Sequence, residues 1–114
     1  GVGAVVVALW LWRPVRRVEV AGDSMLPTLT HGDRLLVVHP ARARVGDLVA
    51  VADPRSSERT MVKRVAARGP GGVTVLGDNP GASTDSRTLG PLPPGAVRGR
   101  AVYRYFPDDR RWLL

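Results

Sequence analysis

A serine and a lysine are the two residues of this sequence whose side chains could together do chemistry. Ser24 follows an alternating apolar run that includes Val18 and Val20, and it stands shortly before a turn that Pro27 enforces. Gly22, two residues earlier, lets the backbone bend and lets a second chain approach closely. A hydroxyl on such a corner is well placed to act as a nucleophile, but it needs a base.

The composition indicates which residue that base is. The chain has 17 Lys plus Arg residues, and Lys63 is the single lysine among them. Arg stays protonated at any accessible pH, whereas a buried Lys can lose its proton and act as a base. Lys63 lies in the apolar, strand-like run 60–65, which argues against the alternative of a lone surface lysine. The sequence therefore predicts a Ser24/Lys63 dyad.

A neutral lysine requires an apolar environment. A lysine in water has a pKa of about 10.4, so holding it neutral at pH 7 costs about 4–5 kcal/mol. Burial supplies this by disfavouring the charged form, and Val62, Val65 and Met61 offer apolar surface near Lys63. Met25 and Met61 flank the two dyad members, so these methionines either line a substrate groove or pack in the core.

The elements that must position this dyad are β-strands. Short Val-rich runs are separated by turns that contain Gly, Asp and Pro, and the 10 prolines leave little room for helix. In the run 97–106, apolar residues alternate with Arg98, Arg100 and Arg104, which predicts a strand with one solvated face. The expected fold is all-β, with antiparallel sheets. The expected strands are residues 17–20, 34–39, 48–52, 60–67, 73–76 and 97–106.

The two ends of the chain differ from this pattern. Residues 1–12 are uninterrupted apolar sequence, which as a helix spans ~18 Å, short of the ~30 Å hydrocarbon core of a bilayer. Because the sequence begins without a methionine, we interpret 1–12 as the C-terminal part of a membrane anchor. A secretory signal segment and a buried core helix are the alternatives. We expect 13–17 to be a basic juxtamembrane linker, 18–106 the domain that carries the dyad, and 107–114 a loose, charged tail.

Three motifs in order give the chain a resemblance to a known family. Gly22–Leu29, Lys63–Val65 and Gly77–Arg87 resemble the ordered boxes of the type I signal peptidases, and the resemblance covers roughly residues 18–105. Each motif alone is weakly specific, but three in order at workable spacing are strongly specific. The resemblance implies a membrane-bound serine endopeptidase, a hydrolase that uses a Ser/Lys dyad on an all-β fold of antiparallel sheets. It implies no cofactor.

The resemblance also implies a role for each matched residue. Ser24 matches the nucleophile and Lys63 matches the general base. Ser83 matches a serine that hydrogen-bonds the lysine amine and orients it, and Asp85 with Arg87 matches an ion pair that shapes the loop beneath the site. Since an ionised carboxylate favours a charged lysine, Asp85 must pair with Arg87 rather than with Lys63. Substrates of the family are exported precursors with small side chains at the first and third positions before the cut.

The chain departs from the family's pattern in two places. Many bacterial members carry a serine two residues before the nucleophile, where its hydroxyl helps bind the oxyanion, and here that residue is Gly22. The oxyanion must then be bound by backbone N–H groups, including that of Ser24, and by a further donor that the sequence does not identify. The Gly-Asp that usually follows the lysine motif is replaced by segment 68–71. No part of the chain corresponds to the large accessory domain of some members, which predicts a minimal catalytic core.

Composition narrows the remaining possibilities. The chain has no cysteine, so it has no disulfide and no thiolate metal site, and its histidines, His31 and His39, lack the context of a triad or of a metal site. The net charge of +7 suits a solvated face or an anionic membrane surface. Aromatic residues are few and no nucleic-acid-binding motif is present, so we expect no nucleic-acid partner. We expect a monomer whose partners are precursor proteins and membrane lipid.

The sequence leaves three alternative functions open. The first is a leader-removing maturation protease for a nickel superoxide dismutase, as in small actinobacterial-type members of the family, although these often differ in the loop after residues 77–79. The second is a self-cleaving repressor of the SOS type, but Ala21-Gly22 lies too close to Ser24 to be its scissile bond. The third is a non-enzymatic, membrane-tethered β-domain. Orientation is open too, because the family's catalytic domain faces outward whereas the basic segment 13–17 favours the cytoplasmic side.

Overall fold

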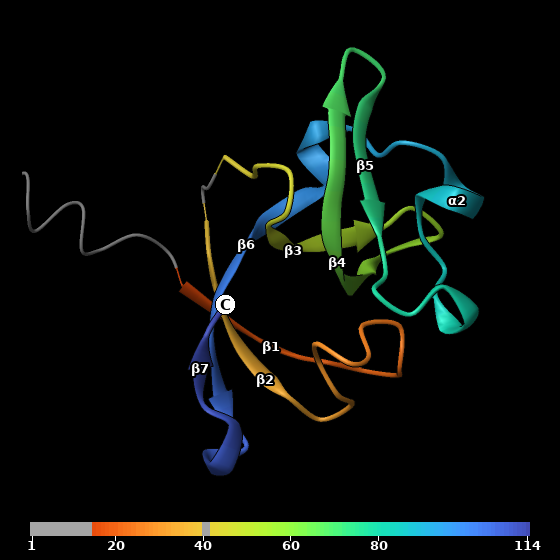
Figure 1. Ribbon diagram of the computed structural model, residues 1–114. Helices are drawn as coiled ribbons and strands as arrows, with labels where there is room; N and C mark the ends of the chain where they lie inside the picture. The colour runs from red at the N-terminus through yellow and green to blue at the C-terminus, as the bar shows by residue number, and fades with distance from the viewer. Residues whose placement is uncertain (1–14, 40–41) are drawn as a thin grey trace, which may run out of the picture.

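In the computed structural model, which describes residues 15–39 and 42–114, one antiparallel sheet forms the framework. Its strands pair in the order β1-β2-β6-β3-β4-β5, and β7 also pairs with β6 (Figure 1). The strands are β1 (Val15–Glu19), β2 (Arg34–Val38), β3 (Leu48–Asp53), β4 (Ser56–Gly69), β5 (Gly72–Leu76), β6 (Val97–Phe106) and β7 (Trp112–Leu113). The all-β fold expected from the Val-rich runs is confirmed.

Short helical turns occupy the connections between the later strands. They are η1 (Pro80–Ala82), α2 (Ser86–Leu89), η2 (Pro94–Ala96) and η3 (Asp108–Arg110). Pro80 and Pro94 open η1 and η2, where the fixed φ of proline fits a helical first turn and its missing N–H is not needed. The Asp85 carboxylate caps α2 by accepting the backbone N–H of Arg87. These turns position loops between the strands without adding a second layer.

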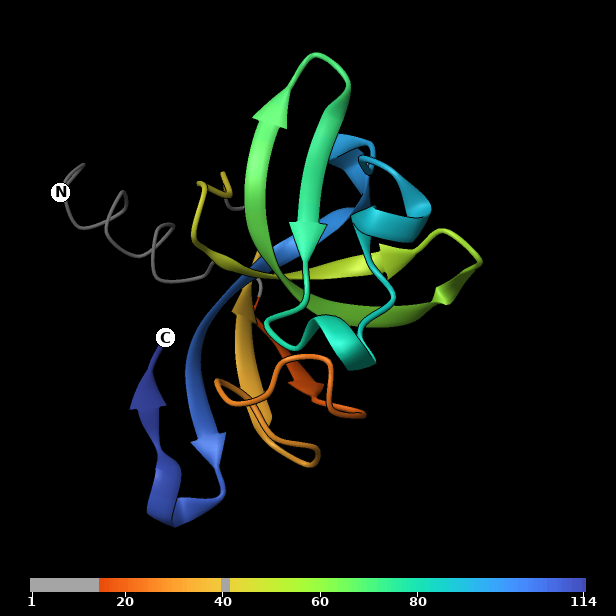
Figure 2. The same cartoon turned by 45° about the vertical axis from the view of Figure 1, so that its right-hand side comes forward.

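Strand β6 runs through both halves of the sheet (Figure 2). Its first residues, from Val97 to Arg100, pair with β3, and the residues from Arg100 to Phe106 pair with β2. Gly99 lies where these two pairings meet. A Cβ on Gly99 would lie 2.6 Å from both a Val37 methyl group and the Val38 carbonyl oxygen. The close approach of β6 to β2 therefore requires a residue without a side chain.

The buried apolar residues form two clusters that meet at β3 and β4. The first contains Val20, Met25, Leu29, Leu35, Val37, Leu48, Ala50, Val62 and Ala101. The second contains Ala43, Val49, Val51, Met61, Val65, Val73, Val75 and Leu92. Because successive side chains of a strand point to opposite faces, neighbouring residues of β3 and β4 belong to different clusters. The segment that carries Lys63 is therefore packed on both faces.

The ends of the described chain are more ordered than the sequence indicates. Strand β1 begins at Val15, so the latter part of segment 13–17, expected as a linker, is strand. The prediction of a loose tail at 107–114 is wrong, because β7 pairs with β6 and the Leu114 N–H donates to the Val102 carbonyl. Residues 1–12, expected to be part of an anchor, lie outside the described residues. Within the described ranges, no helix has the length and apolar character needed to cross a membrane.

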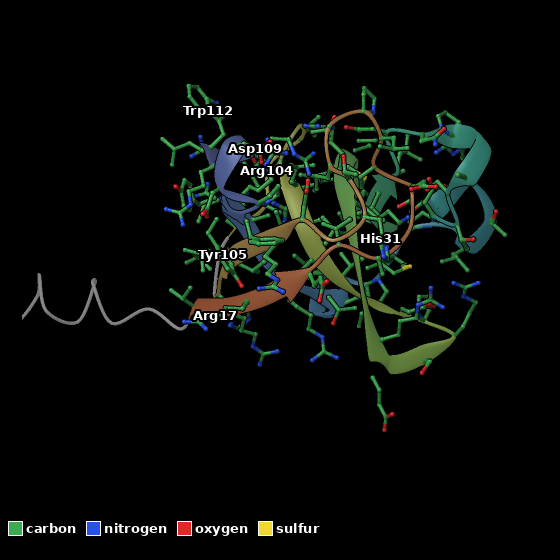
Figure 3. The ribbon with its side chains drawn as sticks, turned by 90° about the horizontal axis from the view of Figure 1, so that it is seen from below. Arg17, His31, Arg104, Tyr105, Asp109 and Trp112 are labelled. Atoms are coloured by element: carbon green, nitrogen blue, oxygen red, sulfur yellow. The ribbon has the colours of Figure 1, made fainter. Side chains whose placement is uncertain are left out.

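The position of Arg104 also differs from the sequence prediction. It is expected on the solvated face of its strand, but its side chain is only 14% exposed and lies against the buried carboxylate of Asp33 at 3.4 Å. Arg110, in the tail, donates to the same carboxylate at 2.6 Å. Figure 3 shows Arg104 beside the C-terminal segment that carries Asp109 and Trp112. The tail is therefore fastened to the β1–β2 loop, in which Asp33 lies.

Candidate active site

Ser24 lies in the loop that joins β1 to β2. Backbone hydrogen bonds hold the two sides of this loop together where it leaves the sheet: Val20 N–H donates to Asp33 O and Gly32 N–H to Val20 O, both at 2.8 Å. Farther along, Leu29 N–H donates to Met25 O at 2.9 Å. Met25 and Leu29 are both almost completely buried in the first cluster. The loop is therefore anchored in the core on either side of Pro27, and Ser24 stays partly exposed.

Lys63 lies on β4, opposite Val49 of β3, and only 4% of its surface is exposed. By strand alternation its side chain shares a face with Met61 and Val65, whereas Val62 belongs to the other cluster. The apolar surroundings expected for Lys63 are therefore supplied on its own face by Met61 and Val65. Val62 packs on the opposite face of the strand.

One pocket of about 180 Å³ brings Ser24 and Lys63 together. Its wall on one side is the segment that ends β1 and enters the loop, and its wall on the other side is the first part of β4. The lining residues are Glu19, Val20, Ala21, Gly22, Asp23, Ser24, Met25, Arg55, Arg59, Thr60, Met61, Val62, Lys63, Ala82 and Thr84. Met25 and Met61 both line the pocket and both pack in the core, and a role for them in a substrate groove stays a prediction. Among the described residues, no hydrogen bond joins Ser24 to Lys63.

Ser83 and Asp85 form a chain of hydrogen bonds that ends at Lys63. Lys63 Nζ donates to Ser83 Oγ at 3.1 Å, and Ser83 Oγ donates to Asp85 Oδ2 at 2.7 Å. Because the serine proton is given to the carboxylate, the serine oxygen presents a lone pair to the lysine. The amine is thus aimed by a neutral group and is not in direct contact with a carboxylate.

The charges around Lys63 favour its neutral form. Burial lowers the pKa of Lys63; the negative charge of Asp85 opposes this, and the positive charges of Arg87, Arg55 and Arg59 add to it. The net direction is downward, as a general base requires. The expected pairing of Asp85 with Arg87 is present, with Arg87 donating to both carboxylate oxygens at 3.0 and 2.5 Å.

Asp85 itself stays ionised although it is fully buried. Burial raises the pKa of Asp85, but hydrogen bonds from the Arg87 side chain, the Gly77 N–H and Ser83 outweigh it and hold this pKa well below its usual range. Gly77 N–H donates to Asp85 Oδ2 at 2.7 Å. A buried carboxylate with this many donors is satisfied without a proton from Lys63.

Gly77 lets this loop approach the serine. A Cβ on Gly77 would lie 2.1 Å from Ser83 Oγ and 2.7 Å from the Ser24 carbonyl oxygen. Even alanine would push the two serine-bearing segments apart. The glycine of the Gly77–Arg87 motif is therefore explained by a close approach of three chain segments.

Asn79 holds the backbone of the Ser24 turn directly. Its backbone N–H donates to Ser24 O at 2.8 Å, and its side-chain amide donates to Asp23 O at 3.0 Å. The two accepting oxygens belong to the Asp23–Ser24 and Ser24–Met25 peptide groups, so both peptide groups that flank the Ser24 Cα are held. The backbone N–H of Ser24 itself donates to no acceptor within residues 15–39 and 42–114.

Asp78 connects the same loop to β4, a contact that sequence reasoning did not identify. Its carboxylate accepts two hydrogen bonds from Arg64, at 2.9 and 2.8 Å, and one from Thr28 Oγ1 at 2.5 Å. The side-chain hydrogen bond from Arg64 holds the pKa of Asp78 below its ordinary value. Thr28, Arg64 and Asp78 each lie inside one of the three motifs, so the motifs held a signal for this contact, but spacing alone does not reveal which residues meet.

Neither histidine lines the pocket that Ser24 and Lys63 share. His31 Nδ1 accepts the Gly22 N–H at 2.9 Å, and His39, exposed after β2, lines a separate pocket with Arg42 and Arg68. Within the part of the chain that the structure describes, no group of three or more His, Cys, Asp or Glu side chains could hold a metal ion. Lys63 is therefore the candidate base that shares a pocket with Ser24.

Comparison with known proteins identifies a family whose model covers more than half of the chain. The family model described as "Signal peptidase, peptidase S26" matches residues 2–75, which include Ser24 and Lys63. The "Mitochondrial ATP-independent inner membrane protease subunit 1a" of Arabidopsis thaliana is 35% identical over 118 residues, covering 80% of this chain and 70% of the relative. The "Mitochondrial inner membrane protease subunit 1" of Schizosaccharomyces pombe is 29% identical over 118 residues, covering 82% and 74%.

A bacterial relative gives a similar match. The "Probable signal peptidase I-1" of Synechocystis sp. is 30% identical over 141 residues, covering 80% of this chain and 71% of the relative. The family model ends at residue 75, before the loop that carries Ser83, Asp85 and Arg87. The contacts of that loop with Lys63 are therefore supported by the structure alone and not by the family match.

Proposed function

We propose, on the premise that the chain belongs to the signal peptidase family, peptidase S26, that Ser24 and Lys63 form its catalytic dyad. The chain is a serine-type peptidase, a hydrolase of a family that removes signal peptides from precursor proteins. The observation that carries the proposal is the position of Lys63. Its amine is buried in the same pocket as Ser24, and its hydrogen-bond partner is the neutral hydroxyl of Ser83.

The proposed reaction begins with transfer of a proton from Ser24 to Lys63. Neutral Nζ of Lys63 accepts the proton as Ser24 Oγ attacks the carbonyl carbon of the scissile peptide bond. The resulting ammonium gives the proton to the leaving amine of the mature protein, and the leader remains as an acyl-enzyme on Ser24. Lys63 then takes a proton from the water that attacks this ester and passes it to Ser24 Oγ as the ester bond breaks, which releases the leader and restores the serine.

Ser83, Asp85 and Arg87 support this reaction from behind the lysine. Ser83 aims the amine, Asp85 orients the Ser83 hydroxyl, and Arg87 offsets the charge that Asp85 would otherwise exert on Lys63. The Ser24 N–H donates to no acceptor within the described residues, and it is the backbone donor that we assign to the oxyanion. This assignment agrees with the sequence analysis, which predicts that the Ser24 N–H and one further donor bind the oxyanion.

The proposed substrates are membrane-targeted precursors with an N-terminal signal or leader peptide. The names of several relatives place those proteins at a mitochondrial inner membrane, and residues 1–12 of this chain are uninterrupted apolar sequence. We therefore propose a single-pass protein, monomeric and in contact with lipid, whose catalytic domain lies on the outer face. Protease added to sealed cells tests the orientation. It should digest the domain before the membrane is disrupted if the domain lies on the outer face, and only after disruption if it is cytoplasmic.

Cleavage of a synthetic precursor with Ala at the first and third positions before the cut tests the dyad. Ser24→Ala and Lys63→Arg should each abolish cleavage, because arginine keeps a positive charge but cannot accept the proton. Ser56→Ala, at an exposed serine outside the pocket, is the matched control and should cleave at the wild-type rate. Activity above about a tenth of wild type in Lys63→Arg would contradict the assignment of Lys63 as base.

A further inference from the structure

The loop that carries Ser24 is closed at its base by a short ladder of hydrogen bonds. Strand β1 pairs with β2 up to Glu19 opposite Arg34. Beyond the strands, the ladder continues through the bonds between Val20 and the Gly32–Asp33 segment. Past that rung the two sides of the loop diverge, and backbone pairing stops. Alternate residues of a strand direct their backbone groups to the partner strand, so after Val20 the next N–H in register with the ladder is that of Gly22.

The side chain of His31 supplies the missing rung. Its Nδ1 accepts the Gly22 N–H at 2.9 Å, across nine residues of sequence. Figure 3 shows His31 on this loop, beyond the end of β1. Since Gly22 N donates, Nδ1 carries no proton and the proton of the neutral ring lies on Nε2. The imidazole therefore does for the loop what a backbone carbonyl would do in a regular hairpin.

The hydrogen bond from Gly22 to His31 restrains a glycine, the residue type with the greatest backbone freedom. Gly22 has a φ of +81°, lines the pocket, and lies two residues before Ser24. Nothing lies within 4 Å of the position that its Cβ would occupy, so this side of the residue is open space. Asn79 holds the next two carbonyl groups along the chain, those of Asp23 and Ser24. The turn is thus held by His31 at Gly22 and by Asn79 at Asp23 and Ser24.

We propose that His31 is a positioning residue for the nucleophile, acting through the Gly22 N–H to set the direction of the backbone that enters Ser24. This rests on the proposed function in that Ser24 is taken as the nucleophile. The bond also commits the Gly22 N–H, so Gly22 does not replace the missing serine of the family's oxyanion site by means of its own backbone. His31 acts as a hydrogen-bond acceptor in this role and transfers no proton in the reaction.

Substitutions at His31 distinguish an acceptor at one place from a generally stabilising side chain. Asparagine carries an oxygen at nearly the position of Nδ1, whereas the oxygen of glutamine lies one methylene farther out. We expect His31→Ala and His31→Gln to lower kcat by about tenfold with KM little changed, since misplacing a nucleophile slows the chemical step. His31→Asn should recover kcat to within about threefold of wild type. His39→Ala, at the other exposed histidine, is the matched control and should keep the wild-type kcat.

A second measurement reads the contact without any cleavage. Amide exchange of Gly22, followed by NMR of labelled protein, should be slow in wild type and His31→Asn, and faster in His31→Ala and His31→Gln. Wild-type kcat in His31→Ala, or a His31→Asn protein as impaired as His31→Ala, would overturn the proposal. So would rapid exchange of Gly22 in the wild type. Protected Gly22 in a protein whose Ser24→Ala variant cleaves normally would instead overturn the proposed function, because the contact would exist beside a serine that is not the nucleophile.

Discussion

Asp85 and Asp33 are both fully buried and both paired with arginine, yet the two pairs have different origins in the chain. Asp85 is paired with Arg87, two residues away in the same loop. Asp33 is paired with Arg104 and Arg110, which are 71 and 77 residues away. The first pair lies behind Lys63 and sets the charge that the amine experiences. The second joins the C-terminal tail to the base of the Ser24 loop.

The difference teaches that similar ion pairs can serve separate purposes in a small domain. A pair made within one loop needs no distant segment to bring its two partners together, so it can adjust a neighbouring group while leaving the sheet unchanged. A pair made across the whole chain forms only when the sheet is complete, so it reports on the fold. We therefore expect substitutions near Asp85 to alter catalysis and its pH dependence, and substitutions near Asp33 to alter the free energy of unfolding.

Lys63→Met should have the largest effect on the Asp85 side. Methionine keeps an unbranched stem but has no amine to accept a proton, so kcat should fall by more than about a thousandfold. The wild-type rate should rise with pH through the folded-state pKa of Lys63, which burial holds below its ordinary value. Steady-state cleavage of a precursor peptide across pH 5 to 10 measures both.

The same variant should be no less stable than wild type. Because the folded-state pKa of Lys63 is lowered, the unfolded chain binds a proton that the folded chain resists, and wild-type stability rises with pH between the two values. Below the folded-state pKa the wild type bears the whole penalty of a buried ammonium, so Lys63→Met should gain most in Tm there. Thermal melting across the same pH range measures this. A Lys63→Met protein that melts far below wild type at acidic pH would identify Lys63 as a charged structural residue.

Ser83→Ala should have an intermediate effect. Without the hydroxyl, Lys63 stays neutral but is less well aimed, so the rate should fall by roughly ten- to a thousandfold. A loss as severe as that of Ser24→Ala would contradict its supporting role, and so would a wild-type rate. Ser86→Ala is a useful comparison, since Ser86 lies in the same motif but its hydroxyl accepts the Val75 N–H and does not contact Lys63.

Asp85→Asn and Asp33→Asn form a matched pair with smaller effects. Asp85→Asn removes a charge that raises the pKa of Lys63 and leaves Arg87 unopposed, so the acid limb of the pH–rate profile should move to lower pH and kcat should fall about tenfold. Asp33→Asn should leave the profile in place while lowering the free energy of unfolding by about 2 kcal/mol. A shifted profile in Asp33→Asn, measured on the folded fraction, would erase the distinction between the two pairs.

Arg110→Ala should have the smallest effect. Its guanidinium is partly exposed and Arg104 remains to pair with Asp33, so the free energy of unfolding should fall by about 1 kcal/mol or less. The value of kcat should be unchanged, because Arg110 touches no residue of the pocket wall around Lys63. Urea denaturation followed by tryptophan fluorescence gives the first quantity and the peptide assay gives the second.

Much of the fold was predictable, because each Val-rich run is short, alternating and bounded by turn residues. The strands at 34–38, 48–53, 72–76 and 97–106 fall within a few residues of the runs that predicted them. The tail was not predictable in this way. Strand β7 has two residues, too few to show a period, and it exists because β6 offers it an edge.

The candidate site was predictable where its residues lie within one motif. One residue lies between Ser83 and Asp85, and one between Asp85 and Arg87, so a local loop brings them together. The contacts of Arg104 with Asp33, of Asn79 with Asp23 and of His31 with Gly22 depend on how distant or diverging segments meet. Alternation places Arg104 on the outer face of its strand, and only the fold of the tail over that face makes it an internal residue.

The packing of Gly77 between Ser24 and Ser83 has a consequence for moving this chemistry to another protein. The serine turn and the loop from Gly77 to Arg87 touch at Gly77 with no space for a methyl group, and the same loop contacts the lysine strand through Ser83. A graft of the serine and lysine segments alone would leave the amine without its aim and the turn without the Asn79 clamp. The transferable unit is therefore three segments from distant parts of the chain, and a host scaffold must reproduce their mutual spacing to within the width of a single carbon atom.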